Sequence, residues 1–401
     1  MNTNTWREVP LKALFRRRET TGRADLPLLS VYRDFGVVLR EGRDDNYNKP
    51  SEDLSTYRVV RPGDLVLNKM KTWQGSLGVS KFSGIVSPAY FVCEQVGSGD
   101  PRFLHHLLRS EPLIAEYGKR SKGIRPAQWD LPWDEFRSIT IRLPEIQDQR
   151  AIADYLDAET ARIDALIEKK QRMVELLEAR EQSALDTWAG EQFHRWPAVP
   201  FRRLIQRIEQ GWSPQCEARP AEPLEWGVLR TSAISSGSFR PEENKHLPDE
   251  VTPNLRWVVR DGDLLMTRGS GSKTMVGQAA VAQTDGRRLM MSDLTYRLLT
   301  KTSSPDYLAS LLRARRVRGE LESAIRTDTG MTLKVRAEDI KDLRVPHTPL
   351  AEQLFSVSCL QAELDSVRRT QARIEDQLRL IREHRQALIT AAVTGELGVA
   401  A

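Results

Sequence analysis

The stretch LQAELDSVRRTQARIEDQLRLIREHRQAL, residues 360–388, decides the architecture of this chain. Its apolar residues recur at alternating spacings of four and three, the heptad pattern of a helix that packs against another helix. The positions on this repeat are Leu360, Leu364, Val367, Gln371, Ile374, Leu378, Ile381, Arg385 and Leu388. Because the stripe is narrow and the rest of the segment is rich in Glu, Arg and Gln, it predicts a long helix that needs a partner helix.

An equivalent stripe occurs 204 residues earlier, at Leu156, Thr160, Ile163, Ile167, Lys170, Val174, Leu177, Glu181 and Ala184. Neither proline nor glycine interrupts the sequence from Ile146 to Ala189, which predicts a helix of roughly 40 residues. One such stripe would favour a homodimeric coiled coil, whereas two in one chain favour intramolecular, antiparallel pairing. Four polar positions, Lys170, Glu181, Gln371 and Arg385, are expected to help fix the register. The predicted apolar seam comprises Leu156, Ile163, Ile167, Val174, Leu177, Leu360, Leu364, Val367, Ile374, Leu378 and Ile381.

The sequence outside the stripes is duplicated as well. Asp100-Pro101 and Ser304-Pro305 each begin a helix, with an oxygen-bearing cap and proline at the first helical position, again 204 residues apart. Earlier in the chain the offset falls to 199, where Arg61-Pro62-Gly63-Asp64-Leu65 matches Arg260-Asp261-Gly262-Asp263-Leu264. These matches predict an α+β fold with a pseudo-twofold tandem repeat, in which two mixed α/β heads are separated by two long antiparallel coiled-coil helices.

The repeat also sets the expected domain boundaries. The first head is predicted at residues 1–143 and a central helical spacer at 144–190, followed by the second head at 191–345 and a C-terminal helical spacer at 346–401. A single helix is expected from Pro101 to about Tyr117. Short apolar runs between glycine and proline residues predict strands at 63–67, 78–79, 89–93, 264–266, 277–281 and 294–298.

Composition limits the class of protein. With 401 residues and 40% hydrophobic content, the chain has enough apolar residues for at least two cores, which excludes a disordered or fibrous protein. The first residues, MNTNTWREVP, lack an apolar signal core, and the apolar runs are short, so a cytoplasmic protein with no membrane partner is expected. Cys93, Cys216 and Cys359 have no metal-ligand spacing and are expected to pack in a reducing compartment. A net charge of +5 permits a polyanionic partner but decides little alone.

Three segments resemble a known family. Lys69-Met70-Lys71-Thr72-Trp73-Gln74-Gly75, followed by Gly84-Ile85-Val86-Ser87-Pro88-Ala89-Tyr90, resembles the first recognition domain of type I restriction-modification specificity subunits. The segment from Leu143-Pro144 to Ile163 resembles that family's central helical region, and Pro349 to Leu397 resembles its C-terminal counterpart. The resemblance covers essentially the whole chain, in the order head, helix, head, helix.

The resemblance implies a non-catalytic DNA specificity subunit. Each head would be a target recognition domain that reads one half of a bipartite, asymmetric sequence in double-stranded DNA. The helices would dock two methyltransferase subunits, and restriction subunits are further expected partners. No cofactor is expected in this chain; S-adenosylmethionine, ATP and Mg would belong to the partner subunits. The alternatives are a self-contained DNA methyltransferase or nuclease with duplicated recognition domains, and a structural coiled-coil adaptor.

Basic, amide and aromatic residues in the loops are the candidates for DNA contact, since such side chains bind phosphates and base edges. In the first head the candidates are Asn68, Lys69, Lys71, Trp73, Gln74, Lys119, Arg120, Lys122 and Arg125. In the second head they are Arg230, Arg268, Lys273, Arg326, Lys334 and Arg336. Each of these residues taken singly is otherwise an ordinary solvated side chain, so the clusters are stronger candidates than their members.

Catalytic and metal motifs fail on their chemistry. Ser87-Pro88-Ala89-Tyr90 lacks the first carboxylate or amide that an amino-methyltransferase needs to accept from the target amine. In the run from Gly269 to Thr274, Ser272 replaces the glycine that precedes the lysine of a phosphate-binding loop and the four-residue spacing is absent, so the run is expected to be a loop. His105 and His106 are adjacent, so on a helix they diverge by about 100° and are expected at its surface. No catalytic residue and no metal ligand is predicted.

Overall fold

The computed structural model describes residues 6–33, 35–40, 51, 53–123, 129–234, 237–327 and 332–398. The chain forms two compact units, the first made of residues 1–171 with 375–401 and the second of residues 172–374. Each unit contains one head and one part of each of the two long helices.

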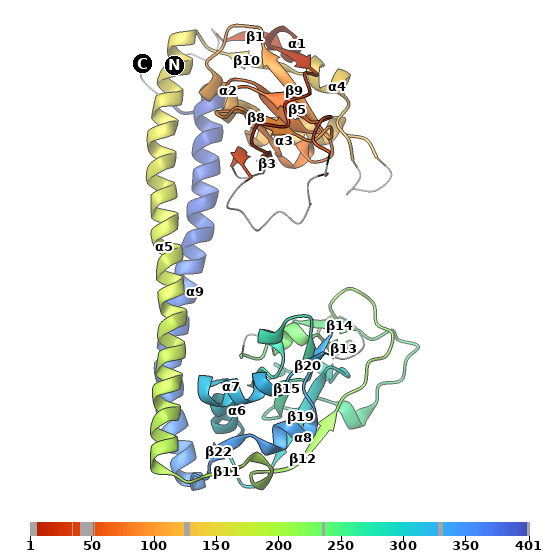
Figure 1. Cartoon of the computed structure of the whole chain (residues 1–401), viewed down its shortest axis with the longest axis vertical. Helices are drawn as coiled ribbons and strands as arrows, with labels where there is room; N and C mark the ends of the chain where they lie inside the picture. Colours follow the sequence, from red (N-terminus) through yellow and green to blue (C-terminus); the bar gives the residue numbers. More distant parts are fainter. Residues whose placement is uncertain are drawn as a thin grey trace. The chain divides into compact units, whose positions relative to one another are not determined.

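The two long helices are α5 (Ile146–Arg195), with 50 residues, and α9 (Leu350–Thr394), with 45 (Figure 1). Helix α5 begins where predicted but extends beyond the expected 40 residues. Gly190 lies inside it, because an interior glycine costs only about 1 kcal/mol relative to alanine and does not by itself end a helix. Pro197 lies two residues past the helix end. Helix α9 stops before Gly395, whose φ of 83° is the left-handed conformation common just after a helix.

In the first unit, α5 and α9 lie side by side and run antiparallel. Arg385 of α9 donates to Asp164 of α5, with its Nε 2.8 Å from Oδ1. One turn or more further along α5, Lys170 donates to Gln377 at 2.6 Å. The residue number rises on α5 as it falls on α9, which fixes the antiparallel sense.

The same sense holds in the second unit. Arg368 of α9 donates to Glu181 of α5 at 2.8 Å, and Arg195 of α5 donates to Glu352 of α9 at 3.3 Å. The predicted intramolecular antiparallel coiled coil is therefore confirmed. The polar seam residues Lys170, Glu181 and Arg385 each bond to the opposite helix, as a register-fixing role requires.

The apolar seam residues lie on the covered side of the helices. Six of them are buried: Leu156, Leu360, Leu364, Val367, Ile374 and Leu378. The other five are half-buried: Ile163, Ile167, Val174, Leu177 and Ile381. Four apolar residues that lie between the stripe positions, Leu166, Met173, Leu176 and Leu380, are exposed.

The first head has a four-stranded antiparallel sheet in the order β2-β9-β6-β7, with helices on one side of it and three small two-stranded sheets, β1-β10, β3-β4 and β5-β8. Its elements are β1 (Arg7–Pro10), α1 (Leu11–Leu14), β2 (Phe15–Arg18), β3 (Leu29–Tyr32), β4 (Gly36–Leu39), β5 (Arg58–Val60), β6 (Leu65–Asn68), the 3-10 helix η2 (Thr72–Gln74), β7 (Leu77–Val79), β8 (Gly84–Val86), β9 (Tyr90–Gln95), α2 (Pro101–Leu108), α3 (Glu111–Arg120), α4 (Trp133–Ser138) and β10 (Thr140–Leu143).

The second head repeats this plan with the antiparallel sheet β12-β19-β15-β17, the pair β11-β22 and the sheet β14-β13-β18, and it also has the sheet β16-β21-β20. Its elements are β11 (Ala198–Pro200), η4 (Phe201–Arg203), β12 (Ile205–Gln210), β13 (Trp226–Leu229), η5 (Thr231–Ala233), β14 (Asn244–His246), η6 (Leu255–Trp257), β15 (Leu264–Thr267), β16 (Gly269–Ser270), η7 (Lys273–Met275), β17 (Ala279–Val281), β18 (Arg288–Met290), β19 (Thr295–Thr300), α6 (Pro305–Arg313), α7 (Arg315–Ala324), β20 (Arg326–Thr327), β21 (Leu333–Lys334), α8 (Ala337–Asp342) and β22 (Arg344–Pro346). All six predicted strand positions coincide with strands of the two main sheets.

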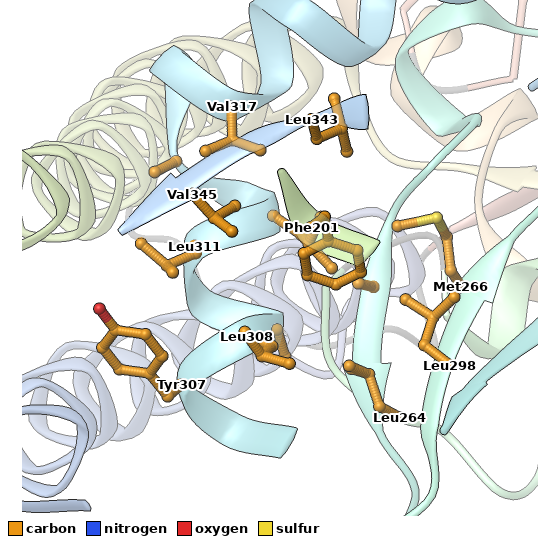
Figure 2. Packing of buried hydrophobic residues seen from close by; sticks show 14 of the residues in the cluster. Phe201, Leu264, Met266, Leu298, Tyr307, Leu308, Leu311, Val317, Leu343 and Val345 are labelled. Atoms are coloured by element: carbon orange, nitrogen blue, oxygen red, sulfur yellow. The ribbon is translucent and has the colours of Figure 1, made fainter. Parts of the chain in front are cut away.

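The core of each head includes side chains from both long helices. In the second head, α6 packs Leu308 and Leu311 toward Leu264 and Leu298 of the main sheet (Figure 2). The same cluster contains Leu185, Trp188 and Ala189 of α5 and Val357, Leu360 and Leu364 of α9. In the first head, the cluster contains Ile152, Ala153 and Leu156 of α5 and Ile389, Ala392 and Val393 of α9. The helices are thus integral to both folds.

A buried glutamine joins each head to the start of its following helix. Gln149 accepts from the backbone N of Asp100 at 2.9 Å and donates to the carbonyl of Pro144 at 2.9 Å. Its repeat equivalent, Gln353, accepts from the backbone N of Ser304 at 2.9 Å and donates to the carbonyl of Thr348 at 2.7 Å. Asp100 and Ser304 are the caps of α2 and α6. The glutamine therefore ties the helix cap of the head to the beginning of the long helix.

We expect Gln149→Leu to destabilise the first unit by about 2 kcal/mol, because it leaves a buried N–H and a buried carbonyl without partners. Gln353→Leu should have a similar effect on the second unit. Gln147→Leu, an exposed position on the same helix turn, is the matched control and should change stability little. Urea unfolding of the three variants measures the effect, and equal midpoints for Gln147→Leu and Gln149→Leu would contradict the anchoring role.

Three expectations for local structure are wrong. The helix expected from Pro101 to Tyr117 is two helices, α2 and α3, because Pro112 near the start of α3 has no N–H to continue the first helix. His105 and His106 are half-buried and do not lie at the surface; His105 Nδ1 is 3.3 Å from the carbonyl of Val79. Cys93 is buried and Cys216 packs against an apolar cluster as expected, but Cys359 is exposed. In the described part of the chain, no helix combines the length and apolar character needed to cross a membrane.

Candidate nucleic-acid interface

The loop after β6 in the first head is held in shape by its own bonds. The Asn68 side chain accepts from the backbone N of Met70 at 3.1 Å, and the Thr72 hydroxyl donates to the Asn68 carbonyl at 2.6 Å. Gly75 ends the 3-10 turn with a φ of 92°, and a Cβ there would lie 3.0 Å from Cδ1 of Ile114. The candidate Lys71 is exposed on this turn, and the candidate Gln74 is half-buried.

Two predicted clusters of the first head come together at this loop. Trp73 packs on Trp129, with the ring centroids 5.0 Å apart. The backbone N of Leu131 donates to the carbonyl of Lys69 at 3.2 Å, and Lys122 pairs with Asp130 through two 2.9 Å backbone bonds. The segment that follows α3 therefore lies against the loop after β6, as a joint binding surface requires.

The basic residues at the end of α3 have acidic neighbours. Arg120 Nε donates to Glu116 at 2.8 Å, and the Lys119 ammonium is 3.6 Å from the same carboxylate. Lys122 donates to Glu135 at 3.0 Å. These pairs partly neutralise the cluster, so its net charge is smaller than the sequence indicates. The candidate Arg125 lies outside the described residues.

In the second head, five of the six candidates gather around the sheet β16-β21-β20. Lys334 of β21 is in register with both Gly269 and Arg326, and the backbone N of Val335 donates to the carbonyl of Arg268 at 3.0 Å. Lys273 follows β16 and is exposed, as is Arg336 at the start of α8. The exposed Arg326 has an acidic neighbour, Asp339, at 3.8 Å.

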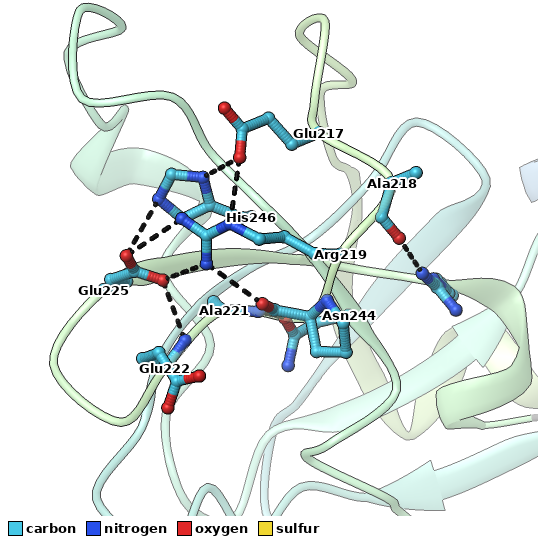
Figure 3. A network of polar contacts seen from close by, with 10 residues as sticks. Glu217, Ala218, Arg219, Ala221, Glu222, Glu225, Asn244 and His246 are labelled. Carbon is cyan, nitrogen blue, oxygen red and sulfur yellow. Dashed lines mark hydrogen bonds and ion pairs between the residues drawn. The ribbon is translucent and has the colours of Figure 1, made fainter.

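The sixth candidate, Arg230, lies elsewhere. It follows β13, and its guanidinium donates to the carbonyl of Ala218 at 2.7 Å. Figure 3 shows the polar network beside it, in which Arg219 bonds to Glu217 at 3.0 Å and to Glu225 at 2.6 Å. His246 of β14 is 3.1 Å from Glu217, so the network fastens this loop to the β13-β14 sheet. Among the described residues, no bond joins Arg230 to the other five candidates, and its contacts indicate a structural role.

The two heads repeat one arrangement at this surface. The ammonium of Lys69 lies 4.7 Å from the ring centre of Phe91 on β9, and the guanidinium of Arg268 lies 5.9 Å from that of Tyr296 on β19. In each head, the carbonyl of the same basic residue accepts from the segment after the second short helix, at Leu131 or Val335. A cation over an aromatic face, on a loop fixed by backbone bonds, is a rigid presentation of positive charge.

Sequence reasoning missed three residues of this surface: Arg17, Arg58 and Trp129. Arg17 lies 4.7 Å from the Phe91 ring centre, and Arg58 donates to the Tyr90 carbonyl at 2.6 Å. The run Arg16-Arg17-Arg18 held a signal, since alternate residues on a strand face opposite sides. Trp129 follows the candidate cluster at residues 119–125, and an aromatic residue between basic ones is a common nucleic-acid contact.

The pKa of Lys69 is lowered below its ordinary value. Partial burial of the ammonium is the largest cause, and the positive charges of Arg58 and Arg17 add to it. This lysine therefore sits in a locally positive and partly desolvated environment. Within the described residues, no group of three or more His, Cys, Asp or Glu side chains could hold a metal ion. The geometry offers positive charge, amides and two packed, mutually tilted indoles, which are groups that bind the phosphates and bases of a nucleic acid.

Sequence comparison relates the chain to known proteins. It is 29% identical over 196 residues to the specificity subunit of the type I restriction enzyme EcoEI of Escherichia coli, which covers 46% of this chain and 33% of the relative. It is 24% identical over 308 residues to the EcoKI specificity subunit of Escherichia coli strain K12, covering 73% of this chain and 63% of the relative. The chain is thus similar in sequence to type I restriction enzyme specificity subunits. No protein-family model matches it.

The alignments cover less than two thirds of the length of these specificity subunits. A comparison with solved structures finds a similarity over a larger part of the chain. A chain from a solved structure on complex assembly and conformational transition of a type I restriction-modification system superposes with a TM-score of 0.67 at 16% identity. That match covers 98% of both chains. The two-head architecture with long helices is therefore the fold that this relative has.

Proposed function

We propose that this chain is the DNA sequence-specificity subunit of a type I restriction-modification complex. The observation that carries the proposal is its sequence relationship to the EcoEI and EcoKI specificity subunits. The repeated loop arrangement supports it, because Lys69 and Arg268 present a positive charge at equivalent places in two heads. The subunit itself performs no chemistry and acts in the cytoplasm.

Each head would read one half of a bipartite target in double-stranded DNA. The loops at the two equivalent places differ, with Asn68-Lys69-Met70-Lys71 in the first head and Thr267-Arg268-Gly269-Ser270 in the second. Because amide and basic side chains choose bases through different groove-edge bonds, unlike loops predict unlike half-sites. The target is therefore asymmetric, in contrast to the palindromes that symmetric dimers read.

The long helices would hold the two heads apart and dock two methyltransferase subunits, with restriction subunits as further partners. A complex that reads two DNA segments from one side needs reading heads separated by about one helical turn of DNA, about 34 Å, or a multiple. Paired helices of this length can set such a spacing, since a residue adds 1.5 Å along a helix. S-adenosylmethionine, ATP and Mg would bind to the partner subunits.

Sequencing of methylated adenines in the host genome, with and without this gene, tests the proposal. We expect one bipartite motif to lose methylation when the gene is deleted and to regain it when the gene is restored. An exchange of the first head should change only one half of the motif. The exchanged head has to keep its contacts with Ile389, Ala392 and Val393 of α9, which complete its core. Loss of no motif, or a change in both halves, would refute the proposal.

A further inference from the structure

Three positive side chains of the first head converge on one edge of its main sheet. Arg17 on β2 and Lys69 after β6 both lie 4.7 Å from the ring centre of Phe91. Arg58 on β5 is anchored beside them by its 2.6 Å bond to the carbonyl of Tyr90, the residue before Phe91. We name Arg17, Arg58 and Lys69 the β-edge cluster.

The β-edge cluster has little negative charge to balance it. Glu19 forms an ion pair with Arg17 and lies 3.5 Å from Arg58, but its own side chain is 59% exposed. Within the described part of the chain, Lys69 forms no salt bridge, although the negative charges of Asp130 and Glu19 oppose the lowering of its pKa. Burial and the charge of Arg17 lower the pKa of Arg58, as burial, Arg58 and Arg17 lower that of Lys69. The three cations therefore repel one another in the unbound protein, and a bound anion would relieve that repulsion.

The cluster lies next to the surface that carries the candidate base-reading residues. Lys69 links the two, because its side chain belongs to the cluster while its backbone carbonyl accepts from Leu131 and its loop leads into Trp73. The side chain of Arg58 is only 12% exposed and is held by a backbone bond, so this charge has a fixed position. Fixed cations beside groove-reading loops suit a phosphate of the DNA backbone, which positions a protein on the duplex without reading its sequence.

The second head lacks this cluster. Arg268 over Tyr296 is the equivalent of Lys69 over Phe91. In the first head, Arg17 of β2 lies opposite Cys93 of β9 in the strand register. The equivalent position in the second head is Ile208 of β12, which lies opposite Leu298 of β19. The residue equivalent to Arg58, by the offset of 199, is Trp257. The positions of Arg17 and Arg58 thus hold uncharged side chains in the second head, although the guanidinium of Arg256 lies 4.5 Å from the ring centre of Trp257.

We propose that Arg17, Arg58 and Lys69 form a binding subsite for one DNA backbone phosphate, present in the first head alone. The proposal rests on the proposed function, because it needs the first head to face DNA. It assigns to this edge of the first head a sequence-independent contact that adds affinity and fixes the position of the half-site.

The test uses the complex with its methyltransferase partners and a duplex that carries the methylated motif. In the variant Arg17→Gln/Lys69→Gln, we expect affinity to fall about tenfold near physiological salt. The plot of log affinity against log salt should become shallower by about one unit, as expected for the loss of one phosphate contact. The methylated motif should stay the same, because the lost contact carries no sequence information. Arg58 is left intact, since its bond to Tyr90 supports the fold.

Arg16→Gln is the matched control. Arg16 lies on the same strand, its side chain is 72% exposed, and it pairs with Glu94 on the opposite face from Arg17. This control should keep the wild-type affinity and salt dependence. Thermal unfolding of each variant shows whether the head is intact, and Lys69→Gln alone, which removes the charge of one half-buried side chain, provides a second variant with a smaller loss.

A series of duplexes, each with one neutral methylphosphonate in place of a phosphate, locates the contact. One position in the half-site read by the first head should weaken wild-type binding and leave binding by the double variant unchanged. If no position shows this coupling, or if Arg16→Gln and the double variant behave alike, the subsite is refuted while DNA binding stands. If the wild-type complex fails to bind the duplex at all, it is the proposed function that fails.

Discussion

Replacement of Arg297 by methionine is expected to destabilise the second unit by about 3–5 kcal/mol, the usual cost of removing one partner from a buried ion pair. The Arg297 side chain is 10% exposed and donates to Glu209 at 2.7 Å and to Asp263 at 3.1 Å. It also bonds to the carbonyls of Val258 and Arg256. Methionine fills a similar volume but leaves the poorly hydrated Asp263 without its cation and Glu209 with only the exposed Arg207.

Arg207→Met is the matched control, because Arg207 contacts the same Glu209 carboxylate at 2.9 Å but is 61% exposed. A surface pair contributes at most about 1 kcal/mol, so this variant should unfold close to the wild type. Urea unfolding of both variants measures these two changes in stability. Similar losses for the two would mean that the buried position of Arg297 has no special importance.

Replacement of Glu181 by glutamine is expected to destabilise the second unit by about 3 kcal/mol, because two arginines share this carboxylate. Arg368 of α9 donates to it at 2.8 Å, and Arg313 at the end of α6 donates at 3.0 Å. The carboxylate therefore joins α5 both to the opposite helix and to the second head. Glu175→Gln, at an exposed pair with Arg172 on the same helix, should cost little.

The contribution of Glu181 should depend on pH with a definite sign. Burial alone would raise the pKa of this carboxyl, but its bonds to Arg368 and Arg313 and their charges outweigh burial and lower it. A lowered folded-state pKa stabilises the protein above the unfolded value of about 4.3, and the stabilisation is lost as pH falls through the folded value. The stability difference between the wild type and Glu181→Gln should be constant from about pH 6 to pH 8 and shrink below about pH 4. A difference that grows on acidification would contradict the ion-pair assignment.

The long helices and their pairing could be predicted from the sequence because a heptad stripe depends only on local periodicity. The role of polar seam residues such as Lys170 and Arg385, which is to bond to the opposite helix, was also predictable, because a narrow interface leaves them few other partners. The extent of α5 was less predictable. Whether a helix continues through Gly190 depends on the neighbouring packing of Trp188 and Ala189 in the second head, which is a tertiary effect.

The binding surface was predictable only in part. Loop residues such as Lys69 and Arg268 could be named from their chemistry, but pairing with an acid, as at Arg120 and Glu116, depends on which elements meet. Arg230 was assigned to the surface on charge alone, and its actual bond to Ala218 comes from a loop ten or more residues away. The fold is therefore needed to tell which charged residues are held in a fixed position and which are ordinary solvated side chains.

The contribution of α9 to the first head has a consequence for synthesis. Ile389, Ala392 and Val393 are buried among residues as early as Trp6 and Leu11. During synthesis, more than two hundred further residues must be translated after the start of α5 before this core can be completed. At typical elongation rates this takes roughly 10–50 seconds. The head translated first is thus completed last, and during that interval its unfilled apolar face is a natural target for chaperones. Deletion of residues 389–393 should accordingly harm the head that lies farthest from them in the sequence.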